Sequence, residues 1–154
     1  MFIHRIAEAL QKQGVAFAVV GGYAVALHGA VRGTVDLDIV LRFKKKDFMA
    51  AEAAFKKMGL TPRLPVSAEQ VFDFREEYIR NRNLIAWSFS NPANPAELLD
   101  VIITHDLGKM RIKNIKAGGR VLPVLAIPDL IAMKKASARA QDLEDIAALE
   151  GLRK

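Results

Sequence analysis

The chain has 154 residues, a formal net charge of +6 and no cysteine. This length suits one domain with a full hydrophobic core, which we expect to span residues 1–154. The lack of cysteine excludes a disulfide framework and a thiolate metal site. No apolar run reaches the ~20 residues of a membrane span, and the N-terminus lacks the pattern of a secretory signal. The sequence therefore predicts a cytoplasmic protein, and its positive charge suits either anionic partners or simple solubility.

The first sixty residues predict helices alternating with strands. Apolar residues at helical spacing near the N-terminus are followed by Gly14, which can end a helix. Asp47 is a suitable N-cap and Gly59 a suitable stop for a later helix. We expect, in order, a helix over residues 3–10, a strand over 15–20, a short helix over 22–29, a strand over 35–41 and a helix over 47–58.

The rest of the chain predicts two hairpins and two closing helices. Between residues 60 and 83 the only clear signal is Ser67-Ala-Glu-Gln70, a capping box for a short helix. We then expect strands over 84–89 and 97–104 around a turn at 91–95, strands over 112–116 and 121–125 around 117–119, and helices over 128–136 and 141–150. This order predicts an α/β (α+β) domain in which a mixed sheet of about four to six strands is flanked by helices.

Two aspartates, Asp36 and Asp38, interrupt the apolar strand predicted over residues 35–41. Because side chains alternate between the faces of a strand, both carboxylates point to the same side. Carboxylates at this spacing can hold one or two hard cations, whereas without a cation their like charges raise the pKa of one of them. Mg²⁺ prefers oxygen ligands, so the pair predicts a magnesium site. The alternative is an exposed strand end with two solvated carboxylates.

The pair Gly21-Gly22 lies between the first strand and the short helix. Without a Cβ, these residues let a phosphate approach the backbone closely, and a helix start offers free N–H groups. The alternative is an ordinary tight turn. If strands 15–20 and 35–41 are neighbours, a phosphate cradle and the metal ligands meet at one edge of the sheet.

The segment 19–41 resembles the nucleotidyltransferases of the DNA polymerase β superfamily, whose strand, Gly-Gly and Asp-x-Asp order it repeats. The fuller pattern, Gly-Gly-x-Ala and then His-Gly-x-x-Arg-x-Thr-x-Asp-x-Asp, is similar to the small bacterial branch of minimal nucleotidyltransferases and abortive-infection toxins. The matching residues are Gly21, Gly22, Ala24, His28, Gly29, Arg32, Thr34, Asp36 and Asp38.

The resemblance implies a nucleotidyltransferase-type fold with C-terminal helices, and the metal-dependent transfer of a nucleoside monophosphate from an NTP to an acceptor hydroxyl with release of pyrophosphate. The implied catalytic residues, which are also the ligands of two Mg²⁺ ions, are Asp36, Asp38 and Asp100, the last on the strand 97–104. The implied nucleotide-binding residues are Gly21, Gly22, Arg32, Thr34 and Lys134, with Lys135 the alternative to Lys134. Arg139, Asp142 and Asp145 are expected to brace the two closing helices.

Several alternatives stay open at the level of sequence. Asp100 could be a polar residue at a sheet edge, Arg32 a surface arginine, and His28 a packed residue rather than a ligand. A basic run of Lys109, Arg111, Lys113, Lys116 and Arg120 could bind nucleic acid or form the solvated face of a hairpin.

The partners are open as well. The acceptor could be transfer RNA or another RNA, a protein or a small molecule such as an antibiotic, and the sequence does not give the base of the NTP. Larger family members carry an extra C-terminal region, so a partner chain or a second copy could complete the site. The alternative function is a non-catalytic nucleotide- or nucleic-acid-binding component of a toxin–antitoxin-like pair.

Overall fold

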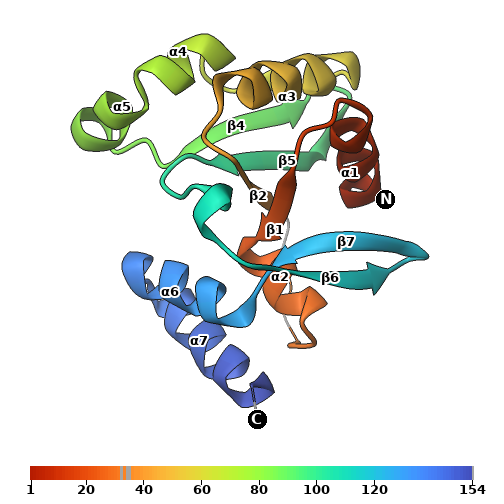
Figure 1. The fold of residues 1–154 in the computed structure, drawn as a ribbon, viewed down its shortest axis with the longest axis vertical. Helices are drawn as coiled ribbons and strands as arrows, with labels where there is room; N and C mark the ends of the chain where they lie inside the picture. Colours follow the sequence, from red (N-terminus) through yellow and green to blue (C-terminus); the bar gives the residue numbers. More distant parts are fainter. Residues whose placement is uncertain (32, 34–35, 154) are drawn as a thin grey trace.

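The protein is described here by a computed structural model that covers residues 1–31, 33 and 36–153 (Figure 1). Its elements follow in the order α1 (Phe2–Lys12), β1 (Phe17–Val20), α2 (Gly21–Leu27), β2 (Leu37–Leu41), α3 (Lys45–Lys57), β3 (Thr61–Pro62), α4 (Ala68–Asp73), α5 (Arg75–Arg82), β4 (Ala86–Asn91), β5 (Asn94–Ile102), the 3₁₀ turn η1 (Leu107–Lys109), β6 (Ile112–Ala117), β7 (Arg120–Leu125), α6 (Ile127–Ser137) and α7 (Ala140–Leu152).

The described residues form one seven-stranded mixed sheet in the order β3-β4-β5-β2-β1-β7-β6. The central strand β2 pairs antiparallel with β1 and parallel with β5, and β1 pairs parallel with β7. The predicted mixed sheet and the two hairpins, β4–β5 and β6–β7, are confirmed. The sheet is one strand larger than expected because the two-residue β3 pairs with the edge of β4. No alternation of apolar and polar residues predicts so short a strand.

Helices cover the sheet in two groups, which Figure 1 shows at opposite ends of the molecule. On one side, α3 packs an aromatic core against β4: the rings of Phe48 and Trp87 stack with centroids 5.9 Å apart, and Phe55 meets Phe89 edge-on at 5.0 Å. At the other end, α6 and α7 pack against each other and α7 against α2. The alternation of β2 sends Leu37, with Ile39 and Leu41, into the core.

Some predicted boundaries are confirmed and others are wrong. The capping box exists: Ser67 Oγ accepts from the Gln70 N–H at 3.2 Å, and Gln70 Oε1 accepts from the Ser67 N–H at 2.9 Å. Asp47 is not an N-cap; α3 starts two residues earlier, and the buried Asp47 carboxylate accepts from Arg42 Nε at 3.2 Å. No pattern predicted α5, which buries no residue and therefore lacks an apolar stripe.

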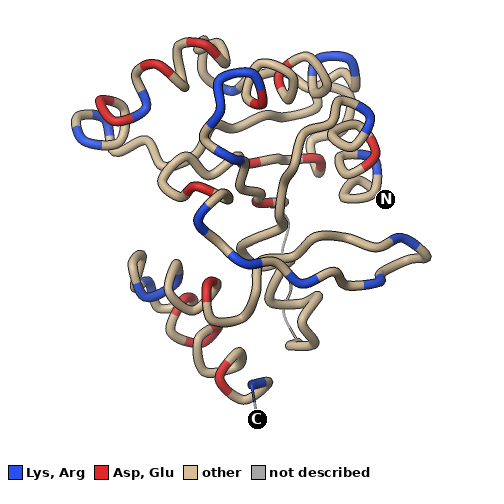
Figure 2. The backbone as a smooth tube through the Cα atoms, in the orientation of Figure 1, with Lys and Arg blue, Asp and Glu red and all other residues tan. Residues whose placement is uncertain are grey.

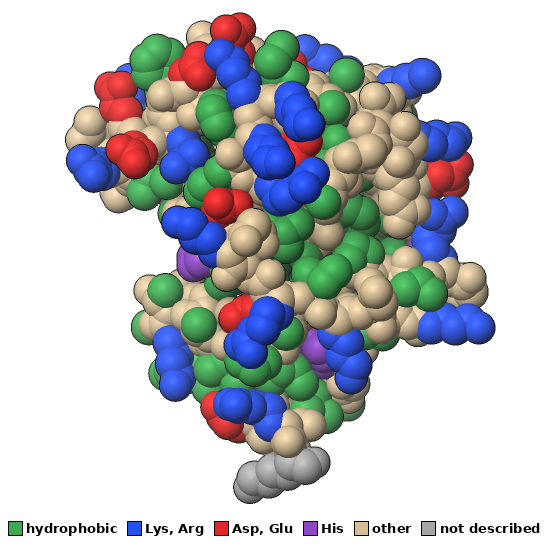
Figure 3. Space-filling view, in the orientation of Figure 1, with side chains coloured by type: hydrophobic (Ala, Val, Ile, Leu, Met, Phe, Trp, Pro, Cys, Tyr) green, Lys and Arg blue, Asp and Glu red, His purple; other side chains and the backbone are tan. Residues whose placement is uncertain are grey.

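The basic run forms the exposed β6–β7 hairpin and its approach. Figures 2 and 3 show Lys and Arg along this hairpin and over the loop before α3. Two of the five cations are paired, Arg111 with Asp129 at 3.5 Å and Arg120 with Glu8 at 3.5 Å. The run therefore serves in part to fasten the hairpin to α1 and α6. Among the described residues, no helix is long and apolar enough to cross a membrane.

Candidate active site

The parallel pairing of β2 with β5 sets Asp38 directly beside Asp100. On its other side Asp38 pairs with Val20, the residue before Gly21. The strand begins one residue later than Asp36, which is exposed in the bend before β2. The fold thus brings together two carboxylates that are 62 positions apart in the chain (100 − 38), with Asp36 at the entrance.

The Asp38 carboxyl has a pKa raised to about 7. Burial is the main cause of this raised pKa, followed by the negative charges of Asp100 and Asp36 and a hydrogen bond with Asp100, while the positive charge of Lys134 opposes it. Asp36 is therefore close enough for its charge to act on Asp38. The site carries negative potential that a bound cation would relieve.

This raised pKa predicts a pH-dependent stability in chelator-treated protein. An unfolded Asp loses its proton near pH 4, whereas folded Asp38 keeps its proton until about pH 7. Because the folded state binds more protons in this window, the free energy of unfolding falls as pH rises, with a slope of up to about 1.4 kcal/mol per pH unit. Urea unfolding from pH 4.5 to 7.5 should show this decline in the parent and a flatter profile in Asp38→Asn. Parallel profiles for the two proteins would contradict the raised pKa of Asp38.

Gly21 lies under the Asp38 carboxylate. Its φ is +68°, in the left-handed region, and a Cβ built on it would stand 2.1 Å from Asp38 Oδ2. Only glycine fits both the backbone angle and the contact. Gly22 follows as the second residue of α2 and is buried. Gly21 therefore sets how closely Asp38 approaches the backbone at the end of β1.

Gly21→Ala should lower the free energy of unfolding by more than Gly14→Ala, and the difference isolates the contact with Asp38. Both glycines have φ +68°, but a Cβ on Gly14 would meet nothing within 4 Å. Each variant therefore bears the left-handed backbone cost of about 1–2 kcal/mol, and only Gly21→Ala adds an overpacking cost of about 1–3 kcal/mol. Equal losses in chemical denaturation would show that Asp38 moves aside freely.

A cavity of about 280 Å³ is lined by Gly21, by Asp38 and by residues of α6 and α7. Its polar lining includes Asp38, Lys134, Arg139 and Asp142, together with Gly21. Its apolar lining includes Ile85, Ile102, Leu130 and Met133. A second cavity of about 340 Å³ shares Thr104, His105 and Met133 with the first. Together they offer room for a ligand beside the carboxylates.

Lys134 and Lys135 have opposite environments. Lys134 is buried in the cavity wall, with Nζ 2.9 Å from Asp145 Oδ2 and 3.4 Å from Asp142 Oδ1, whereas Lys135 is exposed. Lys134 is thus the lysine on the cavity side of α6. The aspartates of α7, expected to brace the helices with Arg139, also balance the charge of Lys134.

Ser88 is a site residue that the sequence analysis missed. Its Oγ donates a hydrogen bond of 2.5 Å to Asp100 Oδ1 from the facing position of the β4–β5 hairpin. Hairpin register is the signal that could have found it, because Ser88 opposes Asp100 only in one register. Glu97, three residues before Asp100, is engaged elsewhere, by Arg5 and by Asn91 Nδ2 at 2.8 Å.

His105 was missed as well, although it follows the strand that carries Asp100. It lines both cavities, and its Nδ1 lies 2.8 Å from Thr104 Oγ1. Burial lowers the pKa of His105. His28, in contrast, is packed: its Nε2 lies 2.8 Å from the carbonyl oxygen of Leu125 and ties α2 to β7. The predicted nucleotide-binding residues Arg32 and Thr34 lie outside the described residues.

The oxygen donors present suit Mg²⁺ in kind. Asp38 and Asp100 are adjacent carboxylates, and oxygen ligands are what this ion prefers. In the described part of the chain, no group of three or more His, Asp or Glu side chains is arranged to hold a metal ion. The described site thus supplies a pair of adjacent carboxylates, with the charge of Asp36 nearby.

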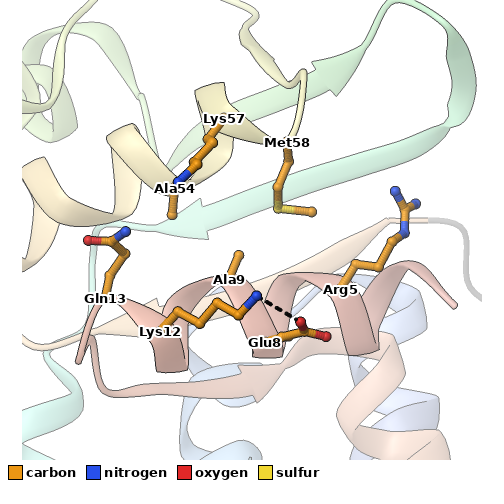
Figure 4. Close-up of a pocket in the computed structure, with 8 residues that line it drawn as sticks. All are labelled: Arg5, Glu8, Ala9, Lys12, Gln13, Ala54, Lys57 and Met58. Carbon is orange, nitrogen blue, oxygen red and sulfur yellow. Dashed lines mark ion pairs between the residues drawn. The ribbon is translucent and has the colours of Figure 1, made fainter.

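A further cavity of about 340 Å³ lies between α1 and α3 and shares no lining residue with the first two. Its walls carry the Lys12–Glu8 ion pair of 3.1 Å, with Arg5 and Lys57 at the rim (Figure 4). Sequence analysis singled out none of these side chains, and Asp38 lines the cavity of about 280 Å³ instead.

Comparison with known proteins gives matches at the level of structure. No family model matches the chain, and no curated protein matches its sequence. The antibiotic-resistance factor ANT(2'')-Ia is similar with a TM-score of 0.65 and 15% identity, over 99% of this chain and 87% of that one. The lincosamide antibiotic adenylyltransferase LnuA has a TM-score of 0.65 and 12% identity, over 98% and 96%.

An antigenic nucleotidyltransferase-like protein from Paracoccidioides brasiliensis is similar with a TM-score of 0.62 and 15% identity, over 98% of this chain and 75% of that one. At these identities the likeness concerns the fold, and each match covers nearly the whole of this chain. The protein therefore has a nucleotidyltransferase-type fold.

Proposed function

We propose that the protein is a nucleotidyltransferase that moves a nucleoside monophosphate from an NTP to an acceptor hydroxyl. The observation that carries this proposal is the Asp38–Asp100 pair, set side by side on β2 and β5, with Asp38 packed against Gly21 in the lining of a cavity. The nucleotidyltransferase-type fold and the Gly-Gly and Asp-x-Asp order of the sequence support the same reaction.

In the reaction, the acceptor oxygen attacks the α-phosphorus and the bond from that phosphorus to the pyrophosphate oxygen breaks. The hydroxyl proton passes to Asp100, which lies directly beside Asp38 on the neighbouring strand. Ser88 donates a hydrogen bond to Asp100 Oδ1 and so helps to hold this carboxylate in place. Pyrophosphate leaves with the electron pair of the broken bond, and Lys134 and Arg139 are the cations in the cavity lining that can interact with its charge.

Two Mg²⁺ ions are proposed as cofactors, held by Asp36, Asp38 and Asp100. When bound, they supply charge neutralisation of the triphosphate and a lower pKa for the acceptor hydroxyl. The chain itself contributes the clustering of these carboxylates. Burial is the largest cause of the raised pKa of Asp38, and repulsion by the other two carboxylates is the next. A non-catalytic component of a toxin–antitoxin-like pair would have no use for such an unfavourable cluster.

For the nucleotide, we propose that Gly21 and Gly22 let the phosphates approach the backbone and that Lys134 adds positive potential to the cavity wall. Arg32 and Thr34 remain proposed phosphate ligands on the strength of the sequence pattern alone. The apolar side chains of the cavity, Ile85 among them, suit the flat face of a nucleobase.

For the acceptor, the neighbours suggest a small hydroxylated molecule. One structure of ANT(2'')-Ia contains adenylyl-2''-tobramycin, and the structure of LnuA contains lincomycin. The exposed basic hairpin β6–β7 keeps RNA as a second candidate. The two classes differ in their salt dependence, which is steep only for RNA.

The deciding experiment incubates the protein with each of the four α-labelled NTPs, Mg²⁺ and one of three acceptor pools: antibiotics, total RNA, or extract protein. We expect one NTP to transfer its label to one pool, with equal release of pyrophosphate. The matched control is the Asp38→Asn variant, which should transfer nothing. Absence of labelling and of pyrophosphate release in every combination would contradict the proposed function.

A further inference from the structure

Two cations, Lys134 and Arg139, line the cavity beside Asp38, and they differ in how exposed they are to a ligand. Lys134 has a side chain that is 8% exposed and is already paired with two carboxylates. Arg139 lines the same cavity with a side chain that is 74% exposed. A ligand that enters the cavity therefore reaches the guanidinium of Arg139 more readily than the ammonium of Lys134.

Arg139 is held by one edge of its guanidinium group. Its Nε donates to Asp142 Oδ2 at 2.9 Å, and its Nη2 lies 3.4 Å from Asp142 Oδ1. The backbone N–H of Arg139 donates to the same carboxylate at 3.0 Å, as part of the cap of α7. The remaining nitrogen, Nη1, makes no hydrogen bond or ion pair with any of the residues 1–31, 33 and 36–153.

Asp142 is itself fixed by Lys134. The Asp142 side chain is 1% exposed, and its Oδ1 lies 3.4 Å from Lys134 Nζ. Although burial alone would raise the pKa of Asp142, hydrogen bonds and the charge of Arg139 hold this pKa well below its usual range, so the carboxylate stays ionised. Lys134 thus contacts Asp142, and Asp142 in turn binds Arg139.

Asp38 lines the same cavity as Arg139, and its charge acts on this arginine. The hydrogen bond and charge of Asp142 chiefly raise the pKa of Arg139, and the charge of Asp38 contributes in the same direction. The two groups that would face a metal-bound polyphosphate, a carboxylate and a guanidinium, thus line one cavity of about 280 Å³.

We propose that Arg139 is a direct phosphate ligand of the nucleotide, presenting the free edge of its guanidinium to the terminal phosphates. This inference rests on the proposed function and names a contact that the function does not itself require. An arginine suits this place because its planar fork can bind a carboxylate along one edge and phosphate oxygens along the other.

The test measures the binding of Mg·NTP, Mg·pyrophosphate and the corresponding NMP by calorimetry, for the parent and for Arg139→Gln, Arg139→Lys and Lys135→Gln. We expect Arg139→Gln to weaken NTP and pyrophosphate binding about tenfold to a hundredfold and NMP binding by less than about threefold. Arg139→Lys should recover part of the loss, because it keeps the charge but not the fork. Lys135→Gln, the exposed neighbour, should bind all three like the parent.

Arg139 also caps α7, so thermal unfolding is recorded for each variant. If Arg139→Gln weakens NTP and NMP equally, or lowers only the melting temperature, the residue is structural and the inference is wrong. If the parent binds and transfers nucleotide while Arg139→Gln binds NTP as tightly, the inference fails and the proposed function stands. If the parent binds none of the four NTPs, both fail.

Discussion

The Asp100→Ala variant should bind Mg·NTP with nearly the affinity of the parent and transfer nucleotide at least a hundredfold more slowly. The reason lies in the roles proposed for the carboxylates, by which Asp36 and Asp38 suffice to bind the triphosphate and Asp100 serves the attacking hydroxyl. Metal-assisted activation of a nucleophile is worth several kcal/mol, and each ~1.4 kcal/mol is tenfold in rate. Calorimetric NTP titration beside single-turnover transfer measures the two quantities separately.

Glu97→Gln is the matched control for this variant. Glu97 is the other carboxylate of β5, three residues away, and it is bound by Arg5 and Asn91 rather than by the site. We expect Glu97→Gln to transfer nucleotide at the parent's rate in the folded fraction. Parent-like transfer by Asp100→Ala would remove Asp100 from the reaction, and a loss confined to Glu97→Gln would move the third carboxylate to that residue.

The double variant Asp36→Asn, Asp38→Asn should lose metal-dependent NTP binding by at least a hundredfold and yet be more stable than the parent without metal at pH 7.5. Binding falls because two of the oxygen ligands lose their charge. Stability rises because the variant no longer ionises a buried carboxyl whose pKa stands at about 7. Titration with Mg·NTP and urea unfolding in chelator test the two halves of this expectation.

The control for the double variant removes two other negative charges. Glu69 and Asp73 lie on α4, where both pair with Lys45 at 3.2 and 3.1 Å. Glu69→Gln with Asp73→Asn changes the net charge equally, away from the cavity, and should leave NTP affinity unchanged. If this control weakens binding as much as Asp36→Asn with Asp38→Asn does, the effect is one of overall charge and the metal assignment is wrong.

Local sequence was sufficient wherever one short segment decides its own structure. Ser67 and Gln70 cap α4 through bonds that span three residues. The glycines 118 and 119 turn the β6–β7 hairpin with positive φ, which few other residues adopt. The Asp-x-Asp pattern likewise indicated an acidic site, although only Asp38 lies within β2 and Asp36 is exposed in the bend before it.

The tertiary structure decided what depends on residues far apart in the chain. Pairing of β2 with β5 brings Asp38 to Asp100, and the hairpin register brings Ser88 to Asp100. No local pattern encodes strand order, since the same apolar alternation suits a place beside several neighbours. The two-residue strand β3 is visible only because β4 offers it an edge.

The C-terminal helices show the same division within a single motif. The sequence by itself placed a helix with Lys134 and Lys135 before a second helix with Arg139 and Asp142, because helix caps and periodicity are local properties. That Lys134 is buried in the cavity lining while Arg139 stays exposed there followed only from packing α7 against α6, where burial of Asp142 requires a partner for its charge. Periodicity selects a face of a helix, but only the neighbour that covers this face decides whether its charge is neutralised or left for a ligand.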